Sequence, residues 1–107
     1  MPPTFKYDYA TMVKSDGTPL TDGTKKIYRA ALNKLAKAGY DTPQSLLDNQ
    51  KAVVNLINTT TNDDGKKRLI LSAIFKTVQH AELAQKQEFY NAFQKVRTAP
   101  ASYEFLD

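Results

Sequence analysis

The chain of 107 residues contains no cysteine, a single histidine, and only four glycines. Without cysteine there is no disulfide framework, no thiolate metal site and no thiol nucleophile, and one histidine excludes a histidine-rich metal site. No apolar run approaches the roughly 18 residues that a membrane-spanning helix needs, and the first residues lack the apolar stretch of a signal peptide. We therefore expect one domain that contacts no membrane and works inside the cell, in the cytoplasm or nucleus.

Recognisable catalytic motifs are missing as well. The glycines stand apart, so there is no glycine-rich phosphate loop, and the spacing of an EF-hand calcium loop is absent. No motif supplies any serine with a general base. Asp63 and Asp64 precede a basic amphipathic segment and are interpreted as helix caps, and His80 lies where a positive charge favours a helix end. We expect no cofactor, no bound metal ion and no enzymatic activity.

Positive charge is concentrated in two segments. Residues 21–40 hold five cations and one anion, and residues 66–81 hold four cations and no anion, so each segment carries +4, the same as the whole chain. Both segments are predicted to be amphipathic helices, and basic helices suit the phosphate backbone of a nucleic acid. A charged helix face also commonly serves only as a solvated surface, and this alternative stays open.

Local patterns predict the first two helices. The first starts at a cap formed by Thr21 or Asp22 and ends before Gly39, which suits the left-handed conformation that closes a helix. The second is short, over residues 43–49, with Thr42 as its cap and a proline in its first position. Both boundaries follow from residues that satisfy the free backbone groups of a helix end.

Three further helices are predicted from apolar spacing. The third covers residues 50–58, the fourth runs from about 64 to 80, and the fifth runs from about 81 to 97. The expected fold is all-α, a compact bundle of four to five helices over residues 21–97. An irregular leader at 1–20 precedes it and a tail or linker at 98–107 follows.

Two polar stripes lie opposite the apolar faces of the basic helices. The first stripe, opposite Ile27, Ala31, Leu35 and Ala38, consists of Lys26, Arg29, Asn33 and Lys37. The second stripe, opposite Ile70, Ala73, Ile74, Thr77 and Val78, consists of Arg68, Ser72, Lys76 and Gln79. Burial of the apolar faces is expected to turn both stripes outward. The candidate DNA-binding residues are Lys25, Lys26, Arg29, Asn33, Lys37, Lys66, Lys67, Arg68, Lys76 and Gln79.

Two segments carry a resemblance to a known family. Residues 20–28, Leu-Thr-Asp-Gly-Thr-Lys-Lys-Ile-Tyr, with Leu32 and Leu35 after them, resemble the opening helix of the SAM-like core-binding domain of tyrosine recombinases and phage integrases. Residues 65–75, Gly-Lys-Lys-Arg-Leu-Ile-Leu-Ser-Ala-Ile-Phe, are similar to a later helix of that domain. The resemblance covers about residues 21–97. The pattern also looks like that of proteins from large DNA viruses and mobile elements.

The resemblance implies a domain that grips duplex DNA with its helices, while a separate catalytic domain performs recombination. Lys26, Arg29 and Lys37 would then position the duplex, and Asn33 and Gln79 would contact base edges. The family's catalytic Arg, Lys, His-x-x-Arg, His and Tyr set is absent, because the only histidine is followed by Ala-Glu-Leu. The implied function is therefore non-catalytic DNA binding.

An alternative is a structural or assembly protein, of the virion type, that reuses the same helical fold. Aromatic residues near both ends would act as arms that hold a homo-oligomer or a partner protein. These residues are Phe5, Tyr7 and Tyr9 in the leader and Tyr103, Phe105 and Leu106 in the tail.

Overall fold

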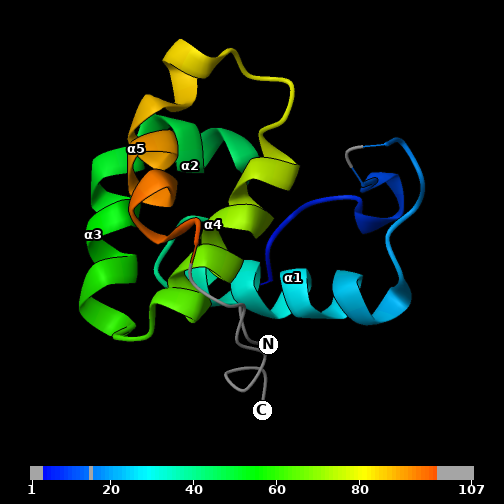
Figure 1. Cartoon of the computed structure of the whole chain (residues 1–107), viewed down its shortest axis with the longest axis horizontal. Helices are drawn as coiled ribbons and strands as arrows, with labels where there is room; N and C mark the ends of the chain where they lie inside the picture. Colours follow the sequence, from blue (N-terminus) through cyan, green and yellow to red (C-terminus); the bar gives the residue numbers. More distant parts are fainter. Residues whose placement is uncertain (1–3, 15, 99–107) are drawn as a thin grey trace.

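A computed structural model describes residues 4–14 and 16–98. Its elements, in chain order, are η1 (Tyr9–Thr11), α1 (Asp22–Ala36), α2 (Pro43–Asp48), α3 (Gln50–Thr60), α4 (Asp64–Thr77), η2 (Leu83–Lys86) and α5 (Gln87–Val96), where η marks a short 3₁₀ helix. The described ranges contain no β-strand, and an isolated antiparallel bridge joins Val13 to Pro19. The prediction of a compact all-α bundle is confirmed (Figure 1).

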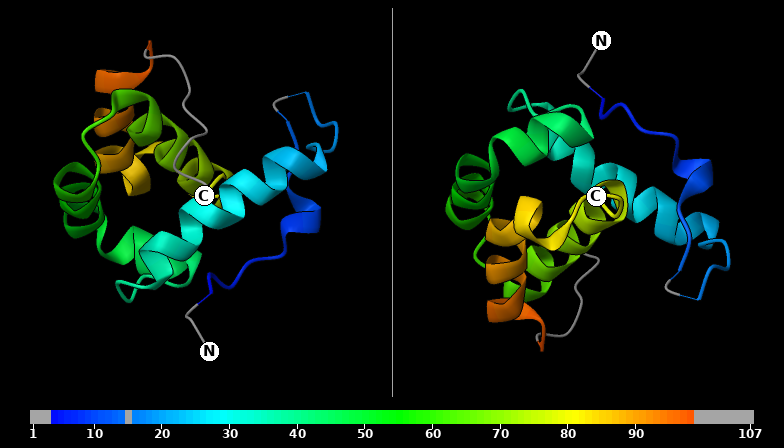
Figure 2. Two further views of the ribbon diagram at one scale, coloured as in Figure 1. Left: turned by 90° about the horizontal axis from the view of Figure 1, so that it is seen from below. Right: turned by 90° about the horizontal axis from the view of Figure 1, so that it is seen from above.

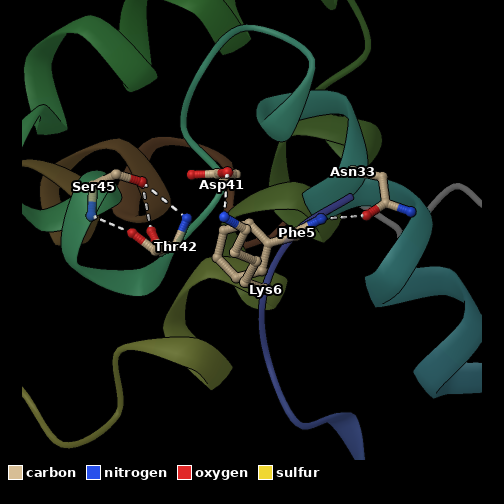
Figure 3. A network of polar contacts seen from close by, with 6 residues as sticks. All are labelled: Phe5, Lys6, Asn33, Asp41, Thr42 and Ser45. Atoms are coloured by element: carbon tan, nitrogen blue, oxygen red, sulfur yellow. Dashed lines mark hydrogen bonds and ion pairs between the residues drawn. The ribbon is translucent and has the colours of Figure 1, made fainter. Parts of the chain in front are cut away.

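Helix starts follow the predicted caps. The Thr21 hydroxyl accepts a hydrogen bond from the Thr24 N–H at 3.2 Å, which opens α1. Thr42 and Ser45 form a reciprocal capping box at the start of α2, drawn in Figure 3. The Asp63 carboxylate accepts from the first-turn N–H groups of α4. Each cap replaces a hydrogen bond that the first turn of a helix cannot make for itself.

Gly39 ends α1 as predicted. Its φ angle is 101°, a left-handed conformation that costs a glycine little because it has no Cβ. The chain can therefore turn back, and the Tyr40 N–H donates to the Leu35 carbonyl at 3.1 Å while the Gly39 N–H donates to the Ala36 carbonyl at 3.0 Å. This pair of bonds is a Schellman motif, which satisfies carbonyl groups at the helix end.

Two predicted helix ends are wrong. α3 continues to Thr60, because the hydroxyls of Thr59 and Thr60 both donate to the Leu56 carbonyl and support the last turn. α4 ends at Thr77 rather than near His80. These ends depend on side-chain hydrogen bonds and packing that apolar spacing alone does not reveal.

The predicted single fifth helix is two elements. A capping box between Glu82 and Gln85 opens η2, and α5 begins only at Gln87. Gln50 of α3 fixes the junction, because its amide nitrogen donates to the Gln85 carbonyl and its amide oxygen accepts from the Glu88 N–H. Leu83, the first residue of η2, is 50% exposed.

One core joins the leader to all five α-helices. α4 contacts α1, α2, α3 and α5, and most of its circumference is buried. The largest fully buried side chains come one from each part of the chain: Met12 from the leader, then Leu32, Leu46, Val53, Ile74 and Phe89 from α1 to α5. Burial of apolar surface at about 25 cal/mol per Å² is the main force that stabilises such a core.

The leader is part of the fold. It runs from the C-terminal end of α1 outward and returns to the start of that helix, as Figures 1 and 2 show. Its side chains Phe5, Tyr9, Met12 and Leu20 are buried. The Lys6 N–H donates to the Asp41 carbonyl at 2.7 Å, and the Lys6 ammonium lies 3.5 Å from the Asp41 carboxylate (Figure 3).

Candidate nucleic-acid interface

The buried face of α1 differs from the predicted one. Ala31, Leu32, Leu35 and Ala36 are buried, whereas Ile27 is half-buried and Ala38 is exposed. The buried face is therefore rotated toward Ala36. The leader explains the rotation, since it adds apolar surface along this side of α1 and the sequence pattern of α1 alone carries no information about it.

Two members of the first stripe contact the leader. The Phe5 N–H donates to Oδ1 of Asn33 at 2.8 Å, as Figure 3 shows. The Arg29 guanidinium carbon lies 4.9 Å from the centre of the Tyr9 ring, within the range of a cation–π contact. Asn33 is half-buried and Arg29 remains exposed at the edge of the leader. The oxygen that Asn33 would offer to a base edge is therefore bonded within the chain.

The second stripe is less open than predicted. Arg68, Ser72 and Lys76 are half-buried, and only Gln79, in the turn after α4, is exposed. The Lys76 ammonium donates to the Val13 carbonyl at 2.9 Å. The expectation that this stripe turns fully outward is therefore wrong, because the leader and four helices pack around α4.

The two stripes do converge, and they converge on the leader. Arg29 and Asn33 reach it from α1, and Lys76 reaches it from α4. The Tyr7 hydroxyl adds a bond in the other direction by donating to the Lys76 carbonyl at 3.3 Å. These polar residues hold residues 4–14 in place, and they leave a smaller set of cations for a ligand.

The remaining candidates lie along α1 and at the start of α4. Lys26 on α1 and Lys37, which caps the C-terminal end of α1, are exposed, and Lys25 is half-buried. Lys66 and Lys67 are half-buried in the first turn of α4, where the Lys67 ammonium lies 3.9 Å from the Asp64 carboxylate. Lys26 and Lys37 are eleven residues apart and share one helix face, separated by about 16 Å along the axis.

A hollow of about 310 Å³ joins these two regions. It is lined by Lys34, Thr60, Thr61, Asn62, Asp63 and Lys66. Burial lowers the pKa of Lys34 below its ordinary value, and the neighbouring charges of Lys66 and Lys37 lower it further. Sequence reasoning omitted Lys34, because it lies beside the first stripe rather than on it. In the sequence, its spacing of three residues from Lys37 is the feature that could have indicated a role for Lys34.

Asp63 contributes the negative charge of this hollow. Its carboxylate accepts from the Gly65 N–H at 2.7 Å and from the Lys66 N–H at 3.3 Å. The free N–H groups at the start of α4 are therefore occupied by the chain itself. Any anion in the hollow has to be held by side chains.

Another hollow, of about 300 Å³, lies among α3, α4 and α5. Val54, Ile57, Leu71 and Val96 give it apolar walls, and charged residues including Glu88 and Lys95 surround them. In the described ranges, no three His, Cys, Asp or Glu side chains are placed to hold a metal ion. Nor does any helix there combine the length and apolarity that crossing a bilayer requires.

No protein-family model, curated protein or solved structure matches this chain. The function is therefore inferred from the placement of its charged and polar residues.

Proposed function

We propose that this chain is a non-catalytic domain that binds duplex DNA, similar in role to the core-binding domain of a tyrosine recombinase or integrase. It would serve DNA recombination or integration in the cytoplasm or nucleus, for a virus or a mobile element. The observation that carries the proposal is the pair of cations exposed after the leader is docked, Lys26 and Lys37 on one face of α1 and its C-terminal end, with Lys66 in the first turn of α4.

The spacing of these cations suits a DNA backbone. Lys26 and Lys37 are about 16 Å apart along α1, which corresponds to about five base pairs at roughly 3.4 Å per base pair. Ala30 lies between them on the same face, and its small side chain allows the helix backbone to come close to a ligand. Contacts of this kind position a duplex and carry little sequence information.

The test is a fluorescence anisotropy titration with a labelled duplex at several salt concentrations. The double variant K26Q/K37Q removes two exposed cations of α1. Its matched control is K51Q/K95Q, which removes two exposed cations from α3 and α5. We expect wild type and control to bind with the same salt dependence. The α1 variant should bind more weakly, with a slope of log K against log salt that is smaller by about two.

Two results would contradict the proposal. One is the absence of wild-type binding to any duplex at low salt. The other is an equal loss of affinity in K26Q/K37Q and K51Q/K95Q, which would indicate a response to net charge alone.

The hollow among α3, α4 and α5 favours a second candidate, an assembly protein that receives an apolar side chain of a partner. Phe5 and Tyr9 are buried in their own core, so a leader arm would have to leave that core before docking elsewhere. The proposed tail arm lies outside the described residues. Light scattering distinguishes the candidates, because a monomer at all concentrations, with or without residues 98–107, contradicts self-assembly.

A further inference from the structure

A further hollow, of about 550 Å³, lies between α2 and the C-terminal end of α4. Its volume falls within the range of small-ligand sites, about 300–1,000 Å³. Leu47 and Val78 give it apolar walls, and neither side chain is exposed. The polar side chains of Gln44, Asp48 and Gln85 are exposed around these walls. The hollow is therefore amphipathic, with apolar walls and a polar edge.

The charge around this hollow is negative. Asp48 supplies a carboxylate, and no lysine or arginine is among the lining residues, so the lining carries −1 with His80 counted as neutral, in a chain of formal charge +4. Thr77, the last residue of α4, also lines the hollow, and the C-terminal end of a helix carries a partial negative charge. The hollow is therefore complementary to a cation.

The cation that fits has an apolar stem and a compact charged head. The aliphatic stem of a lysine side chain would pack on Leu47 and Val78, while its ammonium stays in water beside Asp48. Arginine prefers a fork of two parallel hydrogen bonds to both oxygens of a carboxylate. Oδ1 of Asp48 already accepts from Nε2 of Gln44 at 2.8 Å, so this carboxylate suits a point charge better than a fork.

Two amides at the edge suit a peptide group beside that lysine. Nε2 of Gln44 donates to Asp48, and Oε1 of Gln85 accepts from the Glu82 N–H at 3.0 Å. The other atoms of these amides, Oε1 of Gln44 and Nε2 of Gln85, are an acceptor and a donor. A polypeptide backbone next to the lysine offers both matching partners, which a free amine lacks.

We propose that the hollow between α2 and the end of α4 binds an exposed lysine side chain of a partner protein. None of the residues that line it is a proposed DNA contact. The inference therefore adds a protein-binding surface to the chain, and this surface does not depend on the DNA-binding function.

The first experiment titrates the chain with the blocked peptide acetyl-Gly-Lys-Gly-amide and follows backbone amide signals by NMR at constant ionic strength. We expect shifts in residues 43–48 and 77–81. The same peptide with norleucine keeps an apolar stem and lacks the ammonium, and it should produce smaller shifts, as should the arginine peptide. n-Pentylamine has the stem and the ammonium without a peptide group, and it should bind more weakly than the lysine peptide.

Three results of this titration would overturn the inference. One is the absence of shifts in these residues. Another is an equal response to the norleucine or arginine peptide, which would show that the hollow does not select an ammonium. The third is binding of n-pentylamine as tight as that of the lysine peptide, which would indicate a small amine rather than a protein as the ligand.

The second experiment repeats the titration with D48N, which keeps an acceptor oxygen for Gln44 and removes the charge. Its control is D22N, because Asp22 is also exposed but lies in the first turn of α1. We expect D48N to bind the lysine peptide about two- to five-fold more weakly, the range for an exposed ion pair, and D22N to bind like wild type. Unchanged affinity in D48N, or an equal loss in D22N, would contradict the proposal.

Unfolding does not explain a loss of binding in D48N. Asp48 is exposed at the last position of α2, and a negative charge at the C-terminal end of a helix is unfavourable. D48N should therefore melt no lower than wild type, and a thermal melt of both proteins checks this.

Discussion

The Phe5 N–H donates a hydrogen bond to Oδ1 of Asn33 at 2.8 Å, across 28 positions of sequence. This bond joins the leader to the last turn of α1. It also occupies the side-chain oxygen of Asn33, the residue of the first stripe that was predicted to contact base edges. Asn33 therefore has a structural role. Its position in the sequence alone could not distinguish this role from a contact with DNA.

Replacing Asn33 with alanine should destabilise the fold by about 1–2 kcal/mol, because the Phe5 N–H loses its acceptor in a half-buried position. Asn33→Asp keeps an acceptor oxygen and should lose less. Urea denaturation measures both, and amide hydrogen exchange should show faster exchange at Phe5 in the alanine variant. The exposed Asn55 of α3 provides the control. Equal losses in N33A and N55A would show that the Phe5 contact contributes nothing.

Lys76→Met should also reduce stability, by about 1–3 kcal/mol, since it leaves the Val13 carbonyl without its charged donor. Methionine retains an aliphatic side chain at this position, so the loss of stability measures the contribution of the ammonium group. The partner is a neutral carbonyl, and we therefore expect the loss to be nearly the same at low and high salt. A thermal melt at two salt concentrations tests this, with K51M as the control. A loss that disappears in high salt would indicate long-range charge effects instead.

Tyr9 should titrate well above the ordinary range of a tyrosine. Burial raises its pKa to about 12 against the opposing effect of Arg29, and its hydroxyl has no hydrogen-bond partner in the described part of the chain. Between about pH 10 and pH 12 the folded state therefore holds a proton that the unfolded state releases. Stability should fall as pH rises through that window, and the phenolate absorbance at 295 nm should report the late ionisation.

Tyr9→Phe provides the matched variant for this titration. It removes an unpartnered buried hydroxyl and keeps the ring beneath Arg29, so its stability at pH 7 should equal or exceed that of wild type by up to about 1 kcal/mol. The late absorbance step should vanish. A clear loss of stability in this variant would mean that the hydroxyl has a partner after all.

Phe89 and Tyr90 are neighbours on α5 with opposite environments, 0% and 38% exposed. Phe89→Ala should cost about 3–5 kcal/mol, because it leaves a cavity at the centre of the core. That is a large share of the 5–15 kcal/mol by which a domain is typically stable. Tyr90→Ala should cost about 1 kcal/mol or less. Circular dichroism melts measure both, and similar midpoints for the two variants would contradict the placement of α5.

The helix starts could be predicted because capping is local. Thr21, Thr42 and Asp63 each lie within three residues of the N–H groups that they accept from, so a short stretch of sequence contains the whole interaction. Gly39 is predictable for the same reason. The all-α class follows from these caps and from the apolar spacing between them.

The candidate site was harder to predict because its parts are distant in sequence. The contacts of Asn33 with Phe5 and of Lys76 with Val13 join segments 28 and 63 positions apart. The spacing of apolar residues within α1 or α4 predicts which side of each helix is polar. It does not predict which segment of the chain covers that side. Lys34 was missed for a related reason, since its environment depends on burial and on the charge of Lys66, which belongs to another helix.

The span between Lys76 and Val13 has a consequence for how the chain reaches this fold. A ribosome releases the leader first, yet the ammonium that fixes it is made 63 residues later. We therefore expect the leader to remain without its final contacts until α4 has been synthesised and packed on α1. The leader is therefore made before α4 but secured only after it.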